Sequence, residues 1–117
     1  MNKRQTGSAY EAIAADYLRA KGYEILKQNY RCKSGEIDLI ARDGRYLVFV
    51  EVKYRTTGES GSASAAVNYK KQRIISRVAA FYLIQNRLSE ETPCRFDVVA
   101  IDGEQITVYK NAFDYRE

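Results

Sequence analysis

Residues 35–55 read GEIDLIARDGRYLVFVEVKYR, and this stretch decides how the chain folds. Two apolar segments lie on either side of Asp43-Gly44, a dipeptide typical of tight β-hairpin turns. The pattern predicts two antiparallel strands, over residues 36–41 and 46–54. A buried charge is costly unless it is paired or binds a metal. A physical explanation is therefore needed for the charged residues that lie among these apolar ones: Glu36, Asp38, Glu51 and Lys53.

The turn also predicts which side chains share a face of the hairpin. If Asp43 and Gly44 form a two-residue loop, Arg42 faces Arg45. Glu36 then lies opposite Glu51, and Asp38 lies opposite Phe49. Strand alternation places one set of residues on the charged face: Glu36, Asp38, Ile40, Leu47, Phe49, Glu51 and Lys53. The opposite face is expected to be wholly apolar: Ile37, Leu39, Val48, Val50 and Val52. Such coverage of both faces predicts a central hairpin in a sandwiched sheet.

Three carboxylates on one face are more than Lys53 can balance, and like charges directly opposite one another are destabilising. A divalent cation held by Asp38 and Glu51, with water in its remaining positions, would resolve the imbalance. Mg²⁺ and Mn²⁺ are the ions that suit such oxygen ligands. The alternative is an ordinary Glu51–Lys53 ion pair at a strand end, with Asp38 capping a turn. The combined pattern favours the metal.

A metal in this position implies a defined chemistry. A divalent ion polarises a phosphodiester and lowers the pKa of a bound water. Lys53 would orient or deprotonate that water, or stabilise charge on the phosphate. Glu36 would hold a water or a second metal.

The N-terminal part of the chain predicts a helix that begins at Ser8 and ends before Gly22. Its expected apolar stripe contains Tyr10, Ile13, Ala14, Tyr17 and Leu18. Glu11 has two interpretations. It lies three residues after Ser8 and would complete a capping box, or it points toward the hairpin as an outer ligand of a metal or water.

Periodicity and turn residues also predict the remaining helices and strands. We expect a strand over residues 23–31, a flexible Gly/Ser-rich loop over residues 56–64, a second helix from about residue 65 to 87, and strands over residues 95–101 and 105–109. Asp97 is expected to be a buried acid paired with Arg95 or with a helix residue. The order α-β-β-β-α-β-β predicts a mixed α/β fold with helices against a central sheet. The length of 117 residues predicts one domain, residues 1–117.

Basic residues are concentrated on the second predicted helix and around the hairpin. Lys70, Arg73 and Arg77 recur at helical spacing, and Lys71 is adjacent to them. A solvated surface is the default for such a stripe, and phosphate contact is the alternative. The net charge of +4 permits a polyanionic partner without establishing one. The candidate nucleic-acid contacts are Lys70, Lys71, Arg73, Arg77, Arg55, Arg31 and Lys33.

Composition excludes several classes of chemistry. The chain contains no histidine, which rules out a Ser-His-Asp triad, a Cys-His pair and a histidine-ligated zinc site. Cys32 and Cys94 form no C-x-x-C pair, so neither a zinc site nor a disulfide framework is indicated. No apolar run is long enough to span a bilayer, and no secretory signal is visible. We therefore expect a reduced, cytoplasmic protein with no membrane partner.

The segments GEIDLIA and VFVEVK resemble the restriction-endonuclease-like, PD-(D/E)xK nuclease superfamily. In particular they resemble the YraN-like family, which is similar to archaeal Holliday-junction resolvases. The resemblance extends to Asn29-Tyr30-Arg31, to Lys71-Gln72-Arg73 and to the segment RFDVVAI. The proline of the superfamily motif is replaced here, because Ile37 precedes Asp38.

This resemblance implies a restriction-endonuclease-like α-β-β-β-α-β core with a central mixed sheet flanked by helices. It also implies that Asp38 and Glu51 are metal ligands and that Lys53 is the catalytic lysine. Glu11 matches an acidic residue that such nucleases often carry on the first helix, and Glu36 is part of the family motif.

We therefore expect a Mg²⁺- or Mn²⁺-dependent endonuclease that acts on DNA, with branched or damaged DNA as candidate substrates. The first alternative is a non-catalytic nucleic-acid-binding module on the same fold, and the second is a protein-interaction domain. By analogy with resolvases, which often act in pairs, a homodimer is also expected.

Overall fold

The computed structural model describes residues 3–55 and 67–117, so the predicted loop over residues 56–64 lies outside the described residues. Helices and strands follow one another in the order α-β-β-β-α-β-β, as predicted. Their bounds are α1 Lys3–Ala20, β1 Glu24–Cys32, β2 Gly35–Asp43, β3 Tyr46–Arg55, α2 Tyr69–Gln85, β4 Cys94–Asp102 and β5 Gln105–Phe113.

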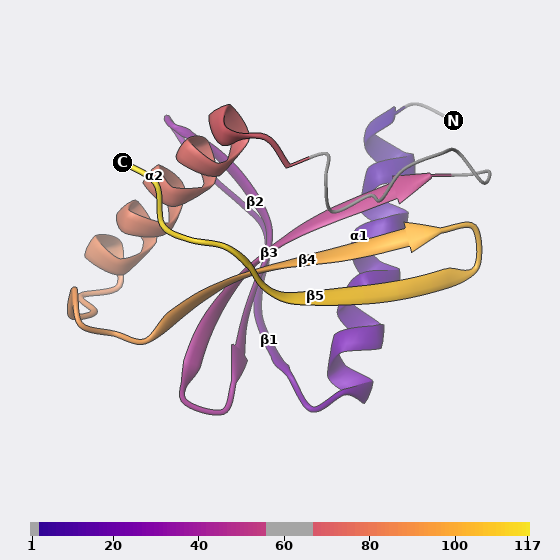
Figure 1. The fold of residues 1–117 in the computed structure, drawn as a ribbon, viewed down its shortest axis with the longest axis horizontal. Helices are drawn as coiled ribbons and strands as arrows, with labels where there is room; N and C mark the ends of the chain where they lie inside the picture. The colour runs from indigo at the N-terminus through magenta and orange to yellow at the C-terminus, as the bar shows by residue number, and fades with distance from the viewer. Residues whose placement is uncertain (1–2, 56–66) are drawn as a thin grey trace.

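The strands form one mixed sheet in the order β1-β2-β3-β4-β5. β3 and β4 are parallel, whereas the other neighbouring pairs are antiparallel. A parallel pair needs a crossover connection, and α2 lies in the segment between β3 and β4. Figure 1 shows α1 and α2 on opposite sides of the sheet. This arrangement confirms the expected α/β class and the restriction-endonuclease-like core.

Each helix covers a separate apolar layer of the sheet. On the α1 side, Ala14, Ala15 and Leu18 pack on a sheet layer that contains Leu39, Ala41, Val48, Val50 and Val99. On the α2 side, Ile75, Val78 and Tyr82 pack on a layer that contains Ile37, Ile40, Leu47, Phe49 and Phe96. The central hairpin is buried on both faces, as predicted. Among the described residues, no helix is long and apolar enough to cross a membrane.

Helix α1 differs from the prediction at its start. It begins at Lys3 rather than at a Ser8 cap, and Ser8 is an exposed residue inside the helix. Lys, Arg and Gln are good helix formers, so residues 3–5 extend the helix beyond the predicted cap. The predicted capping box between Ser8 and Glu11 is therefore wrong. Ile13 was predicted to face the core but is 45% exposed, because the alanines at 14 and 15 form the close contact with the sheet.

The hairpin register is two residues away from the predicted one. Asp43 pairs with Tyr46 and Ile40 pairs with Phe49, so the loop consists of Gly44 and Arg45. The turn is centred on Gly44 because this residue takes the left-handed conformation, with φ at +60°. The last regular pair is Leu39 with Val50. The next positions along the two strands are Asp38 and Glu51, and the predicted pairing of Glu36 with Glu51 is wrong.

The pleat of β2 is also interrupted, which the predicted alternation did not anticipate. Ile37 packs on the α2 side with Ile40, whereas Leu39 packs on the α1 side. Ile37 was predicted to share a face with Leu39, and that assignment is wrong. The interruption lies at Asp38, opposite a stretch of β1 in which Asn29 has φ at +54°. Asp38 therefore leaves the regular strand geometry in the middle of the sheet.

Candidate active site

The candidate site lies where β2 and β3 separate. Their pairing ends at Leu39 and Val50, while β3 continues alongside β4 as far as Arg55. In Figure 1, β3 turns away from β2 at this level. The carboxylate of Asp38 lies in the fork, where Oδ2 accepts a hydrogen bond from the Val52 amide at 2.8 Å. Because the β2–β3 pairing has ended, the Asp38 carboxylate takes the place of a backbone acceptor on β2 for the Val52 amide. This bond fixes the position of the Asp38 side chain.

Glu51 is the most deeply buried acid of the fork, with 6% of its surface exposed. Burial, and then the hydrogen bond and charge of Asp38, raise the pKa of Glu51 to about 8, although Lys71 and Lys53 oppose this shift. Its Oε2 lies 3.2 Å from Nζ of Lys71. The same oxygen accepts no well-directed hydrogen bond from the residues that the structure describes. Glu51 is therefore a buried acid whose charge is incompletely compensated.

Glu11 approaches the same acids from α1, on the other side of the sheet from α2. Burial, and then the charge and hydrogen bond of Asp38, raise the pKa of Glu11 to about 7, with a further contribution from Glu36. Its Oε1 is shielded from solvent and accepts no hydrogen bond within the described part of the chain. The structure thus places Glu11 beside the hairpin acids. Its role as an outer ligand stays a prediction.

Glu36 and Lys53 lie at the edge of this group. Glu36 Oε2 accepts a hydrogen bond from Arg31 Nε at 2.6 Å, and both side chains are partly exposed. Lys53 is partly buried, and its positive charge favours the ionised form of Glu51. The structure therefore brings Glu11, Glu36, Asp38, Glu51 and Lys53 to one end of the fork.

Lys71 reaches this site from the first turn of α2, although its sequence position suggested a nucleic-acid contact. Burial by itself would lower the pKa of the Lys71 ammonium. The charge of Glu51 close to this ammonium, together with the charges of Asp38 and Glu36, outweighs burial and raises the pKa of Lys71. The only sequence signal for this placement is the helix periodicity that separates Lys71 from the stripe of Lys70, Arg73 and Arg77.

The other predicted nucleic-acid contacts lie on α2, in the turn before β2 or near strand ends. Lys70, Arg73 and Arg77 are exposed on α2, Lys33 is exposed in the turn before β2, and Arg55 is partly buried at the end of β3. Arg31 forms an ion pair with Glu36, which compensates part of its charge. The structure therefore distinguishes Lys71, which contacts the buried Glu51, from the exposed basic residues.

The acids of the fork fit a divalent cation. Two shielded carboxylate oxygens, on Glu11 and Glu51, lack a hydrogen-bond partner among the described residues. Unsatisfied buried oxygens of this kind are what a cation would stabilise. Within the described ranges, no three acidic or thiol side chains already form a cage. Mg²⁺ is usually held by one or two carboxylates and several waters, which matches Asp38 and Glu51.

The comparison with known proteins identifies the family. Residues 10–101 match the model of the uncharacterised protein family UPF0102. The chain belongs to this family. The match includes the residues of the fork and the first turn of α2, and it confirms the YraN-like family resemblance.

Relatives in this family match nearly the whole UPF0102 chain. A UPF0102 protein of Lachnoclostridium phytofermentans is 55% identical over 97% of both chains. One of Photobacterium profundum is 48% identical over 95% of this chain and 91% of its own. One of Legionella pneumophila is 43% identical over 95% of this chain and 96% of its own. The similarity to these relatives therefore extends beyond residues 10–101, over nearly the whole chain.

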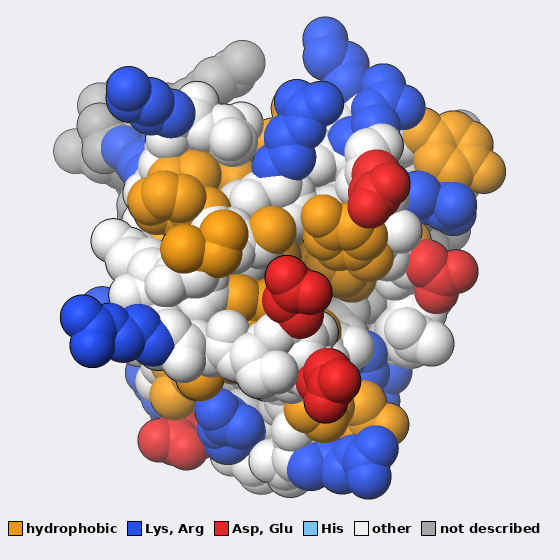
Figure 2. Space-filling model, turned by 90° about the vertical axis from the view of Figure 1, so that its left-hand side faces the viewer, with side chains coloured by type: hydrophobic (Ala, Val, Ile, Leu, Met, Phe, Trp, Pro, Cys, Tyr) orange, Lys and Arg blue, Asp and Glu red, His pale blue; other side chains and the backbone are white. Residues whose placement is uncertain are grey.

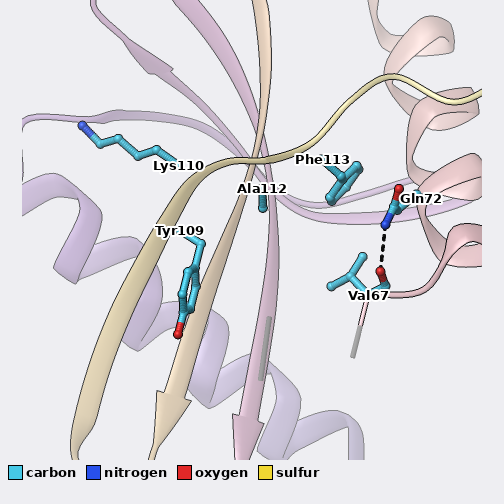
Figure 3. Close-up of a pocket in the computed structure, with 6 residues that line it drawn as sticks. All are labelled: Val67, Gln72, Tyr109, Lys110, Ala112 and Phe113. Atoms are coloured by element: carbon cyan, nitrogen blue, oxygen red, sulfur yellow. Dashed lines mark hydrogen bonds between the residues drawn. The ribbon is translucent and has the colours of Figure 1, made fainter. Parts of the chain in front are cut away.

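Two hollows lie elsewhere on the UPF0102 chain. A pocket of about 370 Å³ lies between β5 and the segment before α2, and Figure 3 shows Gln72 donating a hydrogen bond to the Val67 carbonyl in its wall. A groove of about 540 Å³ runs along α2 and the C-terminal residues. Figure 2 shows hydrophobic and acidic side chains in the middle of that face, with Lys and Arg around its edge. None of the fork acids lines either hollow.

Proposed function

We propose that this protein is a metal-dependent endonuclease that hydrolyses DNA phosphodiester bonds, with Mg²⁺ or Mn²⁺ held by Asp38 and Glu51. The observation that carries the proposal is the meeting of these two acids at the fork, where Glu51 is buried and its Oε2 accepts no well-directed hydrogen bond from the described residues. Lys53 lies two residues farther along β3 and acts on the same acid. Buried acids with raised pKa values beside a cation are typical of catalytic sites.

Each residue of the fork has a role in this reaction. A bound divalent ion would supply the positive charge that polarises the phosphodiester and activates a water molecule. Asp38 enters the reaction already oriented, because the Val52 amide holds it. Lys53 orients the attacking water or stabilises charge on the phosphate. Glu11 has a pKa of about 7, so its Oε1 can take up a proton near neutral pH. Glu36 holds a water at the edge of the site.

The exposed cations provide the affinity for DNA. Lys70, Arg73 and Arg77 on α2 and Lys33 before β2 would contact phosphates beside the fork. Branched or damaged DNA is the proposed substrate, by similarity to resolvases, and a homodimer would allow paired cuts. Cys32 and Cys94 are free thiols, which agrees with the proposed cytoplasmic location.

Cleavage assays test this proposal. Linear duplexes and four-way junctions are incubated with the protein in Mg²⁺ or Mn²⁺. We expect Glu51→Gln and Asp38→Asn to reduce the cleavage rate by roughly 100-fold or more, because each removes a charged ligand of the ion. Glu90→Gln, at an exposed acid in the loop before β4, is the matched control and should cleave normally. Equal cleavage by the wild type and Glu51→Gln would assign the activity to a contaminant.

A second candidate function is nucleic-acid binding without cleavage. The exposed positions of Lys70, Arg73 and Arg77 on one helix favour it. It predicts an affinity for DNA that falls steeply with salt and does not respond to divalent metal. Metal-dependent cleavage that is lost in Glu51→Gln would contradict this alternative.

A further inference from the structure

The ion pair between Lys71 and Glu51 joins α2 to the candidate active site. Nζ of Lys71 lies 3.2 Å from Oε2 of Glu51, and the Lys71 side chain is 41% exposed while Glu51 is buried. The backbone of Lys71 is fixed as well, because Asn68 caps the helix and accepts a hydrogen bond from the Lys71 amide at 2.9 Å. One end of this lysine is therefore held in place and the other contacts a proposed metal ligand.

The position of Lys71 in α2 is unfavourable for the helix itself. The positive end of a helix dipole lies at its N-terminus, where acidic residues are stabilising and cations are not. The first turn of α2 contains no acidic residue and carries Lys70 and Lys71 instead. Lys71 differs from its exposed neighbours because a buried carboxylate compensates its charge. The Lys71 ammonium therefore lies beside Glu51, where the fork has an excess of negative charge.

We propose that Lys71 is the internal counter-ion of Glu51 in the metal-free protein and moves to a DNA phosphate when a divalent metal binds. This inference rests on the proposed function, because it assigns a further role to a residue of the same site. Lys71 and the metal both neutralise Glu51, so they compete for the same carboxylate charge. Lys71 is a positioning residue for the metal and a binding residue for the substrate.

Charge balance provides the physical reason for this exchange. Asp38 and Glu51 together carry two negative charges when both are ionised, which one divalent ion matches. An ammonium group a few ångströms from that ion would be repelled. Lys71 can leave because its flexible stem is partly exposed, and it remains at the positive end of α2 beside Lys70 and Arg73. A phosphate next to the fork is the anion it would then meet.

Two measurable consequences follow from competition at Glu51. Removal of the ammonium group should strengthen metal binding in the absence of DNA. The same change should remove the gain in DNA affinity that metal binding confers, because no lysine is released toward the phosphate. In the wild type, metal and DNA should therefore bind with positive cooperativity, and each should increase the affinity for the other.

Calorimetric titration of Mn²⁺ into the wild type, Lys71→Met and Lys70→Met tests the first consequence. We expect Lys71→Met to bind Mn²⁺ roughly fivefold to tenfold more tightly than the wild type. Lys70→Met changes the net charge equally on the same helix turn, but its side chain is exposed. Because Lys70 is a surface charge, its removal should change the Mn²⁺ affinity by no more than about twofold. Circular dichroism confirms folding, and Lys71→Gln serves as a second, polar variant.

Fluorescence anisotropy with a short DNA duplex, with and without Ca²⁺, tests the second consequence. We expect Ca²⁺ to increase the DNA affinity of the wild type but not that of Lys71→Met. Lys70→Met removes a proposed phosphate contact, so it should bind DNA more weakly with and without Ca²⁺ but keep the gain that Ca²⁺ confers. Unchanged or weaker Mn²⁺ binding by both Lys71 variants, beside clear binding by the wild type, would overturn the exchange and leave the nuclease proposal intact. Failure of the wild type itself to bind Mn²⁺ at millimolar concentration would instead overturn both.

Discussion

Among the residues that the structure describes, two acids are fully or almost fully buried, and their surroundings differ. Asp97 has no exposed surface, and it accepts hydrogen bonds from Arg95, from the Tyr23 hydroxyl and from the Asn111 amide, all between 2.9 and 3.0 Å. Glu51 contacts the single cation Lys71 and has a buried oxygen without a hydrogen-bond partner in the described part of the chain. The first acid is structural, whereas the second is costly to the fold unless it binds something.

This contrast predicts opposite effects of two amide substitutions on stability. Glu51→Gln should increase the free energy of unfolding of the metal-free protein by about 1–2 kcal/mol, because burial raises the pKa of Glu51 to about 8 and this acid therefore costs free energy at neutral pH that a neutral amide does not. Asp97→Asn should reduce it by about 3 kcal/mol or more, because it removes the buried carboxylate charge to which Arg95, the Tyr23 hydroxyl and the Asn111 amide donate hydrogen bonds. Urea unfolding in the presence of a chelator measures both. A less stable Glu51→Gln would contradict the assignment of Glu51 as an uncompensated acid.

The surroundings of Asp43 predict how the free energy of unfolding depends on pH in the acidic range. Its hydrogen bond from Arg95, at 2.8 Å, holds the pKa of Asp43 below its usual value. A carboxyl with a lowered pKa in the folded state stabilises fully above the unfolded-state pKa, and this contribution is lost as the pH falls through the folded-state pKa. We expect the free energy of unfolding of the wild type to decline below about pH 4, and that of Asp43→Asn to decline less steeply. Urea midpoints across this range provide the measurement, and parallel curves would exclude the ion pair.

At the scale of elements, the fork depends on how closely α2 packs against the start of β2. Gly35 has φ at +150°, and a Cβ atom there would lie 2.6 Å from Cγ2 of Ile74 on α2. A larger side chain at this position would require the Ile74 side chain, or the helix that carries it, to move. The close packing of α2 at this point therefore depends on a glycine.

This close approach predicts that Gly35→Ala destabilises the protein by about 2–4 kcal/mol, through both backbone strain and overlap with α2. Gly103→Ala is the matched control, because Gly103 also has a positive φ, of +62°, but a Cβ there meets nothing within 4 Å. It should cost only about 1 kcal/mol. Thermal unfolding of both variants measures the difference, and equal costs would show that contact with Ile74 is unimportant.

At the scale of the whole molecule, the candidate site is made by four elements that come from both layers of the fold. Glu11 lies on α1, Asp38 on β2, Glu51 on β3 and Lys71 on α2. Because the two helices lie on opposite sides of the sheet, the fork is the place where side chains from both layers meet. Ligand binding at this point would therefore stabilise contacts throughout the fold.

A metal held by Asp38 and Glu51 should stabilise the protein by mass action. Mn²⁺ at ten times its dissociation constant should add about 1.4 kcal/mol to the free energy of unfolding. Asp38→Asn should show little or no such gain. Thermal melts over a series of Mn²⁺ concentrations measure the effect, with Glu90→Gln as the control that should respond as the wild type does. An equal shift in Asp38→Asn would place the ion at another site.

Local pattern was sufficient for the architecture. Alternation of Leu39, Val48 and Val50, the glycine turn and the helical spacing of Ile75, Val78 and Tyr82 are properties of neighbouring residues, and each element formed close to where they indicated. Helix α2 begins at Tyr69, after the Asn68 cap, rather than near residue 65 as predicted. The hairpin register was wrong because it depends on which turn residue takes the left-handed conformation. The start of α1 was wrong because good helix formers extended it past Ser8.

Apolar periodicity and residue chemistry were enough to predict the fold class and the group of acids from which any site must be built. The family followed from the resemblance of the segments GEIDLIA and VFVEVK. The three-dimensional structure was needed to show that Asp38 faces Val52, that Glu11 approaches from α1 and that Lys71 contacts Glu51 rather than joining the exposed stripe. These contacts join residues far apart in the chain. Their geometry depends on the interrupted pleat at Asp38 and on the close packing of α2 at Gly35.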